Sequence, residues 1–335
     1  MVAISVLDLV PVIEGEGPRD ALLKSIELAR HAEALGFTRY WVAEHHNMVG
    51  IASAATAVVI GQLAAATRTM RIGAGGIMLP NHAPLVIAEQ FGTLEALFPG
   101  RIDLGLGRAP GTDQLTLRAL RRNPMSADSF PQDVLELQAL FAPAGPNQAV
   151  RAVPGEGLQV PLWILGSSLF GAQLAAELGL PYSFASHFAP DALMQALAIY
   201  RERFKPSGQL QSSYAMPGIN VVAAETDAEA RYLATSLQQR FVGMVRGARG
   251  KLQPPIDDIE PYWSPAEKAH VSQMLRYAFI GSPETLRREL GAFVAKTGAD
   301  EIMVTAPIFD HEKRKRSYEI VAGLAPELGK ARGAA

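Results

Sequence analysis

The chain contains no cysteine among its 335 residues. Disulfides, thiolate metal sites, thiol nucleophiles and cysteine-ligated iron–sulfur clusters are therefore excluded. The absence fits a reducing compartment. The N-terminal run Met1-Val2-Ala3-Ile4-Ser5-Val6 also lacks the basic start and the long apolar stretch of a secretory signal. We therefore expect a cytoplasmic protein.

Long apolar runs and an excess of basic charge are missing as well. No stretch offers the roughly 18 uninterrupted apolar residues that a membrane helix needs. The net charge is -2 and the pI is about 6.4, so nucleic acid and anionic membranes are poor candidate partners. Hydrophobic residues make up 48% of the chain, which is enough to bury the core of one large α/β barrel or of two ordinary domains.

Short apolar runs alternate with helical segments along most of the chain. Continuous apolar runs are typical of parallel strands that are covered on both faces. The predicted strands occupy residues 4–9, 39–43, 70–79, 101–106, 161–165, 182–185, 217–224 and 301–305. Because nearly every strand is followed by a helix, the pattern predicts a (β/α)8 barrel, as a single domain spanning residues 1–335.

Two stretches interrupt this alternation. After the fourth predicted strand the pattern is less regular, and residues 142–157 carry much proline and glycine, which predicts a loop. Residues 243–263 fit no strand–helix unit, and we expect a long loop there that serves as a lid. The barrel should therefore have insertions after strand 4 and in the 243–263 region. The alternative fold is a doubly wound open sheet with two lobes, linked by residues 142–157.

Polar side chains gather where the predicted strands end, which is where barrel enzymes build their sites. The second strand is followed by Ala43-Glu44-His45-His46-Asn47, the first ends at Asp8, and the sixth at Ser186-His187. We expect one histidine of the pair to face a ligand and the other to anchor the loop. Neighbouring side chains on a strand point to opposite faces, and no His-Glu-x-x-His spacing is present, so we predict no metal site. A hydrogen-bonded, partly buried histidine pair is the structural alternative.

Two further strand ends suit an anion. The run Gly105-Leu106-Gly107-Arg108-Ala109-Pro110-Gly111 is a weak dinucleotide fingerprint, because its third glycine is one position late. It is a better candidate for presenting Arg108 to an anion. Gly166-Ser167-Ser168 combines backbone N–H groups, two hydroxyls and a helix start, which together hold phosphate well. The alternatives are a surface arginine and a serine that only caps its helix.

A pair of glycines, Gly75-Gly76, interrupts the third predicted strand. Glycine weakens a strand, so the pair indicates a bulge, a planar ligand lying against bare backbone, or a cis peptide bond. The alternative is a close approach of a neighbouring element that leaves no room for side chains.

Together these residues resemble the bacterial luciferase-like flavin monooxygenases, and most of all their alkanal monooxygenase alpha-chain-like branch. The resemblance runs over nearly the whole chain with the order of the motifs preserved. The matching stretches are residues 43–46, 73–80, 100–108, 165–168 and 297–304. The resemblance implies a (β/α)8 barrel that binds reduced flavin mononucleotide (FMN) and O₂.

The resemblance also implies roles for individual residues. His45 is expected near the reacting edge of the isoalloxazine ring as the catalytic residue. Gly75 and Gly76 fall where the family has a non-proline cis peptide beneath that ring. Arg108 and Ser167-Ser168 are expected to hold the flavin phosphate, in agreement with the anion site indicated by the residues themselves.

The implied function is a monooxygenase that inserts one oxygen atom from O₂ into a small organic substrate. A separate NAD(P)H–flavin reductase would supply reduced FMN, and the family suggests a homodimer. A sister branch uses the deazaflavin F420, so an F420-dependent oxidoreductase is the main alternative. A non-catalytic flavin-binding protein on the same barrel is another. Gly107 stands where luciferase carries a cysteine, which points away from a long-chain aldehyde substrate and light emission.

Overall fold

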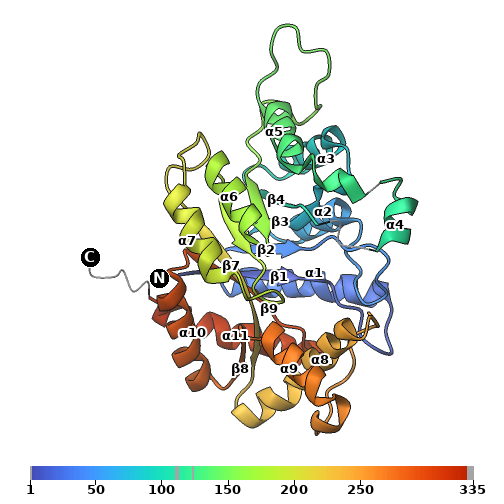
Figure 1. Cartoon of the computed structure of the whole chain (residues 1–335), viewed down its shortest axis with the longest axis vertical. Coiled ribbons are helices and arrows are strands. Elements are labelled where there is room, and N and C mark those ends of the chain that lie inside the picture. The colour runs from blue at the N-terminus through green and yellow to red at the C-terminus, as the bar shows by residue number, and fades with distance from the viewer. Residues whose placement is uncertain (1, 110–112, 123, 330–335) are drawn as a thin grey trace.

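The computed structural model describes residues 2–109, 113–122 and 124–329. Eight parallel strands close into a barrel, which confirms the predicted fold class (Figure 1). In order around the ring they are β1 (Ala3–Asp8), β2 (Arg39–Val42), β3 (Arg71–Met78), β4 (Ile102–Gly107), β5 (Leu162–Gly166), β6 (Tyr182–Phe184), β7 (Ala215–Ala223) and β9 (Glu301–Thr305). The β6–β7 and β1–β9 pairings complete the ring.

A further strand, β8 (Ala278–Gly281), was not predicted from the sequence. It pairs in parallel with the second half of β7, from Asn220 opposite Ala278 to Ala223 opposite Gly281. Its length of four residues does not explain the omission, because β2 is equally short and was predicted.

Helices surround the barrel, as Figure 1 shows. They are α1 (Pro18–Ala34), α2 (Thr56–Ala66), α3 (Pro84–Leu97), α4 (Gln114–Ala119), α5 (Phe130–Phe141), α6 (Leu169–Leu178), α7 (Leu193–Arg203), α8 (Asp227–Val245), α9 (Pro265–Met274), α10 (Pro283–Thr297) and α11 (His311–Leu324). Short 3-10 turns are η1 (Leu79–Asn81), η2 (Pro124–Ala127), η3 (Glu260–Tyr262) and η4 (Ala325–Glu327). Among the described residues, no helix is long and apolar enough to cross a membrane.

Local sequence signals set several of the helix starts. Ser264 and Glu267 form a reciprocal capping box at α9, in which each side chain accepts the backbone N–H of the other residue. Pro265 occupies the first helical position. At α8 the Thr226 hydroxyl accepts the N–H of Glu229 at 3.2 Å. These side chains satisfy N–H groups that the first helical turn leaves without partners.

The two predicted insertions are present, with one correction. Between β4 and β5 the chain forms α4, η2, α5 and a loop, residues 142–157, which projects from the barrel (green, top of Figure 1). The predicted loop 243–263 is shorter than expected, because α8 continues to Val245 and η3 forms a turn near its end. Residues 246–259 between them lie against the segment after β1. There Leu252 accepts a hydrogen bond from Glu14 N at 2.8 Å and donates one to Val12 O at 3.0 Å.

A compact apolar cluster fills the inside of the barrel. It contains Leu7, Trp41, Trp163, Met216 and Met303, which come from five strands. The two tryptophan rings meet edge to face, with centroids 5.1 Å apart. Alternate residues of the same strands pack outward against the helices, as the period of two along a strand requires.

Below this cluster a buried ionic network joins the N-terminal halves of the strands. The Arg39 guanidinium donates to Asp103 Oδ2 at 2.7 Å and to Glu301 Oε1 at 2.8 Å. Ser5 also donates to Glu301, and Trp41 Nε1 donates to Asp103 Oδ2 at 3.1 Å. The network therefore connects β1, β2, β4 and β9 and closes the barrel floor with satisfied charges.

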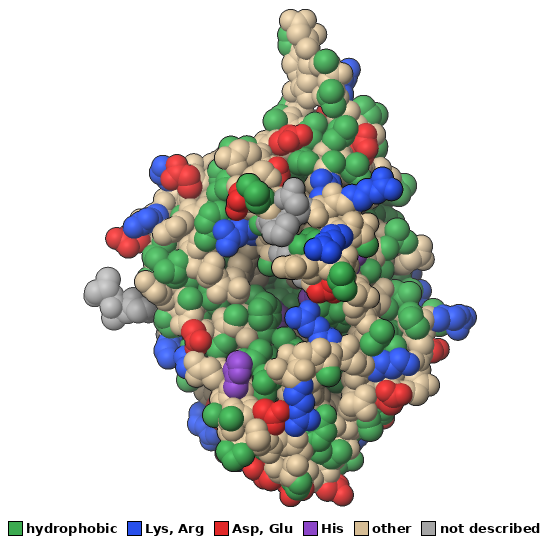
Figure 2. All heavy atoms as spheres, turned by 45° about the vertical axis from the view of Figure 1, so that its right-hand side comes forward, with side chains coloured by type: hydrophobic (Ala, Val, Ile, Leu, Met, Phe, Trp, Pro, Cys, Tyr) green, Lys and Arg blue, Asp and Glu red, His purple; other side chains and the backbone are tan. Residues whose placement is uncertain are grey.

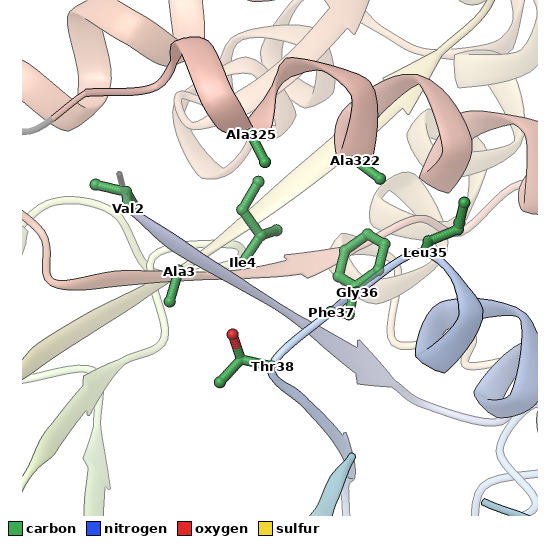
Figure 3. Close-up of a pocket in the computed structure, with 9 residues that line it drawn as sticks. All are labelled: Val2, Ala3, Ile4, Leu35, Gly36, Phe37, Thr38, Ala322 and Ala325. Carbon is green, nitrogen blue, oxygen red and sulfur yellow. The ribbon is translucent and has the colours of Figure 1, made fainter. Parts of the chain in front are cut away.

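A cavity of about 310 Å³ lies at the N-terminal end of the barrel (Figure 3). It is formed by the start of β1, the turn after α1, and α11 with the following turn. The side chains that line it are apolar apart from Thr38, with Ile4, Phe37 and Ala322 among them. Because it faces away from the C-terminal strand ends, it is separate from the predicted site.

Candidate active site

The C-terminal strand ends, here called the barrel mouth, bring the predicted site residues together. Gly107 at the end of β4 lies opposite Met78 of β3 and Leu165 of β5. The segments that carry Gly75-Gly76, Arg108 and Ser167 are therefore neighbours around the ring. Figure 2 shows a hollow on one face of the molecule, with basic side chains at its edge and histidine within it.

Arg108 stacks on an aromatic ring of the helix that follows the two serines. The Arg108 guanidinium carbon lies 4.2 Å from the centroid of the Phe170 ring. Phe170 belongs to the first turn of α6, and Ser168 is the N-cap of that helix. The Ser168 side chain makes no capping hydrogen bond, and both serines are exposed. Within the described ranges Arg108 has no acidic partner. The guanidinium, the two serine hydroxyls and the N-terminus of α6 are therefore available to bind an anion. Pro110 and Gly111 of the same predicted run lie outside the described residues.

The Gly75–Gly76 peptide bond is cis, as the resemblance implies, and the β3–β4 register shifts across it. A side chain at Gly75 would place Cβ 2.8 Å from Leu7 Cδ1, and one at Gly76 would place it 2.7 Å from the carbonyl oxygen of Gly105. Internal packing alone therefore demands glycine at Gly76, where the clash is with backbone, whereas at Gly75 the nearest atom is the end of a leucine side chain that can shift. A role of the pair beneath a flavin ring stays a prediction.

His45, half-buried after β2, is an uncharged imidazole at neutral pH. Burial lowers the pKa of His45, and the nearby charges of Arg240 and Arg249 lower this pKa further, to about 4. Its Nδ1 atom is buried without a hydrogen-bond partner. A neutral imidazole can accept or donate a proton at its two nitrogens, so His45 is suited to general acid–base work.

The neighbouring Glu44 organises a cluster that the sequence did not reveal. Its buried carboxylate lies 2.6 Å from His46 Nε2 and 2.8 Å from His82 Nε2, and it accepts the Met78 N–H at 3.0 Å. The Glu44 backbone N–H donates to Gly76 O at 3.3 Å. His46 is thus the anchoring histidine that was predicted, and Glu44 fixes the end of β3 beside the glycine pair.

Glu44, His46 and His82 are the kinds of side chain that bind a metal ion, with ligand atoms within 4.8 Å of one another. Their carboxylate–nitrogen separations of 2.6 and 2.8 Å are hydrogen-bond lengths. A tetrahedral zinc ion with bonds of about 2.1 Å would hold its ligand atoms about 3.4 Å apart. The geometry therefore favours a hydrogen-bonded cluster, and the absence of a metal stays a prediction.

We expect Glu44→Gln to lower the free energy of unfolding by about 1–3 kcal/mol near pH 6. Burial alone would raise the pKa of Glu44, but hydrogen bonds from His46 and His82 hold it at about 2. The bond to Glu44 in turn raises the pKa of His46. A raised histidine pKa adds stability below the unfolded value of about 6.5, and this stability is lost as the pH rises through the folded value.

Urea unfolding at several pH values measures the effect of Glu44→Gln on the free energy of unfolding. The difference between wild type and Glu44→Gln should shrink as the pH rises above about 6.5. The exposed Glu136 on α5 provides the matched control, and Glu136→Gln should match wild type throughout. A difference for Glu44→Gln that is the same at every pH would show that His46 is not charged in this contact.

Comparison with known proteins identifies the class. A closed parallel barrel with polar side chains at its C-terminal mouth is the architecture of barrel enzymes. The sequence model of the luciferase-like monooxygenases matches residues 6–301, so the chain belongs to this family of flavin-dependent oxidoreductases. The resemblance noted from the sequence motifs is thereby confirmed.

Two relatives match along almost the full chain. The luciferase-like monooxygenase of Escherichia coli (strain K12) is 55% identical over 329 residues, which cover 98% of each protein. The crystal structure of apo-MsnO8 is 34% identical and superposes with a TM-score of 0.90, covering 97% of this chain and 99% of that one.

More distant structures share the fold and differ in cofactor. The oxygenating constituent of 3,6-diketocamphane monooxygenase from Pseudomonas putida, in complex with FMN, has 17% identity and a TM-score of 0.76, with coverage of 99% and 100%. An F420-dependent secondary alcohol dehydrogenase, in complex with an F420–acetone adduct, has 17% identity and a TM-score of 0.71, with coverage of 98% and 99%. Structural neighbours of the chain thus use FMN or F420.

Proposed function

We propose that this protein is a monooxygenase that receives reduced FMN from a separate NAD(P)H–flavin reductase and inserts one atom of O₂ into a small organic substrate. The observation that carries the proposal is the stacking of Arg108 on Phe170, in the first turn of the helix that Ser168 caps, beside the strand ends that bear His45 and the glycine pair. That arrangement offers an anion site and an adjacent space next to a neutral imidazole.

The chain's own groups fit FMN. Arg108 and the serine hydroxyls would bind its phosphate, aided by the N–H groups at the start of α6. The glycine-rich ends of β3 and β4 expose backbone on which a flat ring can rest. Reduced FMN supplies the electrons with which O₂ is activated. His45 would hold or move a proton at the substrate or oxygen atom, since its low pKa leaves the imidazole neutral.

Water must be kept from the site for oxygen insertion to outrun loss of the oxidant. Residues 246–259 are placed to do this, because they lie against the segment after β1. Gly50, which follows the His45 loop, approaches Gly250 so closely that a Cβ at Gly50 would lie 2.2 Å from Gly250 O. We infer that this loop is the lid predicted from the sequence.

Parallel titrations with FMN, reduced FMN and F420 test the cofactor, followed by O₂ consumption with an added flavin reductase. We expect binding of reduced FMN and substrate-dependent oxygen uptake. Binding of F420 with no affinity for FMN would replace the proposal with an F420-dependent oxidoreductase. We also infer a homodimer in the cytoplasm, by analogy with the family, which light scattering of the purified protein and cell fractionation would check.

Arg108→Ala should weaken FMN binding on the order of 10- to 100-fold, because it removes a charge-assisted contact to phosphate. Riboflavin, which lacks the phosphate, should bind wild type and variant alike. Fluorescence titration of both ligands measures this. Arg118 on α4 is also exposed, and Arg118→Ala is the control that should leave both affinities unchanged. Equal losses for FMN and riboflavin would refute a phosphate role for Arg108.

A further inference from the structure

The barrel mouth holds an arginine that the flavin site does not use. Arg240 lies on α8, half-buried. The loop 246–259 folds back along the same helix, since Gln239 Nε2 donates to Pro254 O at 2.8 Å and Ile256 N donates to the Thr235 hydroxyl at 2.8 Å. Arg240 itself makes no hydrogen bond or salt bridge to any residue in the described part of the chain.

The buried acids at this end of the barrel are already engaged. Asp8 at the end of β1 accepts from Arg314 at 2.8 Å and from the Tyr40 hydroxyl at 2.5 Å. Glu44 at the end of β2 is occupied by His46 and His82. Asp8 lies close enough to favour the charged form of Arg240, but burial and the charge of Arg314 outweigh it and lower the pKa of Arg240 to about 10. The guanidinium thus has no hydrogen-bonded acid of its own in a partly desolvated position, which an arriving anion would relieve.

Two neutral histidines face the same space. Arg240 is close enough to His45 and His187 that its charge contributes to lowering the pKa of both. His187 follows β6, and its carbonyl accepts from Asn220 Nδ2 at 2.5 Å. A Cβ at Gly218 would lie 2.6 Å from His187 Nδ1, so glycine there makes room for the ring. The Nδ1 atoms of both histidines are buried without hydrogen-bond partners.

Arg108 stands at the other side of the mouth, after β4, where it is free to hold the flavin phosphate. Arg240 is left for a second anion next to His45. We propose that Arg240, flanked by His45 and His187, binds the carboxylate of an anionic organic substrate at the barrel mouth, an inference that rests on the function proposed above. The planar guanidinium matches a carboxylate with two parallel hydrogen bonds, and the imidazoles can donate to the same group.

Binding of matched acids and amides tests this. The probes are hexanoate with hexanamide and phenylacetate with phenylacetamide, titrated into the FMN-loaded protein and followed by the flavin absorption spectrum. The wild type should bind at least one acid on the order of 10-fold more tightly than its amide, or better. Arg240→Gln should abolish this preference, and Arg240→Lys should keep part of it. Arg231 on the same helix is exposed, so Arg231→Gln should behave as wild type.

The outcomes separate the two proposals. FMN binding to the wild type tests the flavin site by itself, before any probe is added. Arg240→Gln should keep FMN affinity and should not lose thermal stability, because it removes a partly buried charge that no acidic side chain hydrogen-bonds. A wild type that binds no probe acid, or that binds acids and amides alike, overturns the carboxylate site. A large loss of FMN affinity in Arg240→Gln would assign Arg240 to the flavin instead and equally overturn it.

Discussion

Replacing His45 with alanine should lower turnover on the order of 10²-fold or more while leaving FMN affinity largely intact. The imidazole stands at the end of β2, next to the strand that carries the glycine pair and away from the phosphate-side groups of β4 and α6. Its loss should therefore remove proton transfer without removing a flavin contact. Steady-state oxygen uptake with a reductase, set beside an FMN titration, measures both quantities.

The pH dependence of turnover sharpens this prediction. Because burial and the charges of Arg240 and Arg249 lower the pKa of His45 to about 4, the ring is neutral across the ordinary working range. Wild-type turnover should be flat from neutral pH downward and should fall only as the pH approaches about 4. The residual activity of His45→Ala should lack that step.

His270 on α9 is exposed and provides the control, since His270→Ala should match wild type. Turnover unchanged in His45→Ala would remove this side chain from the mechanism. A parallel collapse of FMN affinity would instead make His45 a flavin-binding residue.

The barrel could be predicted because each of its strands has a local sequence pattern. Each covered strand is a continuous apolar run, and capping residues such as Ser264 and Thr226 mark where helices begin. β8 was not predicted, although β2 has the same length of four residues and was. The strand-end rule then placed Arg108, Ser167 and His45 at one mouth, since parallel strands bring their C-terminal ends to the same edge.

What the sequence could not show are contacts between residues far apart in the chain. His82 reaches Glu44 from the turn after β3, 38 positions away, and nothing in the local pattern marks it. Arg240 lies on an ordinary-looking helix, and its significance depends on which acids are already paired by other residues. Which acidic side chain pairs with which arginine depends on the folded structure, because these residues come together only when the barrel closes.

Arg39 offers the largest expected effect on stability. Its guanidinium is held between Asp103 and Glu301, both almost fully buried, and lies 4.7 Å from the centroid of the Trp163 ring. Arg39→Ala leaves the buried Glu301 carboxylate without a cation, while Asp103 keeps Arg71, which lies 2.7 Å from its Oδ1. Breaking one partner of a buried ion pair costs about 3–5 kcal/mol, because the remaining charge is uncompensated. We expect a loss of that size in the free energy of unfolding.

Denaturant unfolding of wild type, Arg39→Ala and Arg39→Lys measures the effect, with the exposed Arg203 of α7 replaced by alanine as the control. Arg39→Lys keeps the charge but loses the fork that reaches both acids, so it should fall between wild type and Arg39→Ala. A cost below about 1 kcal/mol for Arg39→Ala, the scale of an exposed pair, would mean that water reaches the barrel floor and that this network does not hold the strands together. FMN affinity of the folded fraction should stay unchanged in Arg39→Ala, because the network lies at the end of the barrel opposite the mouth.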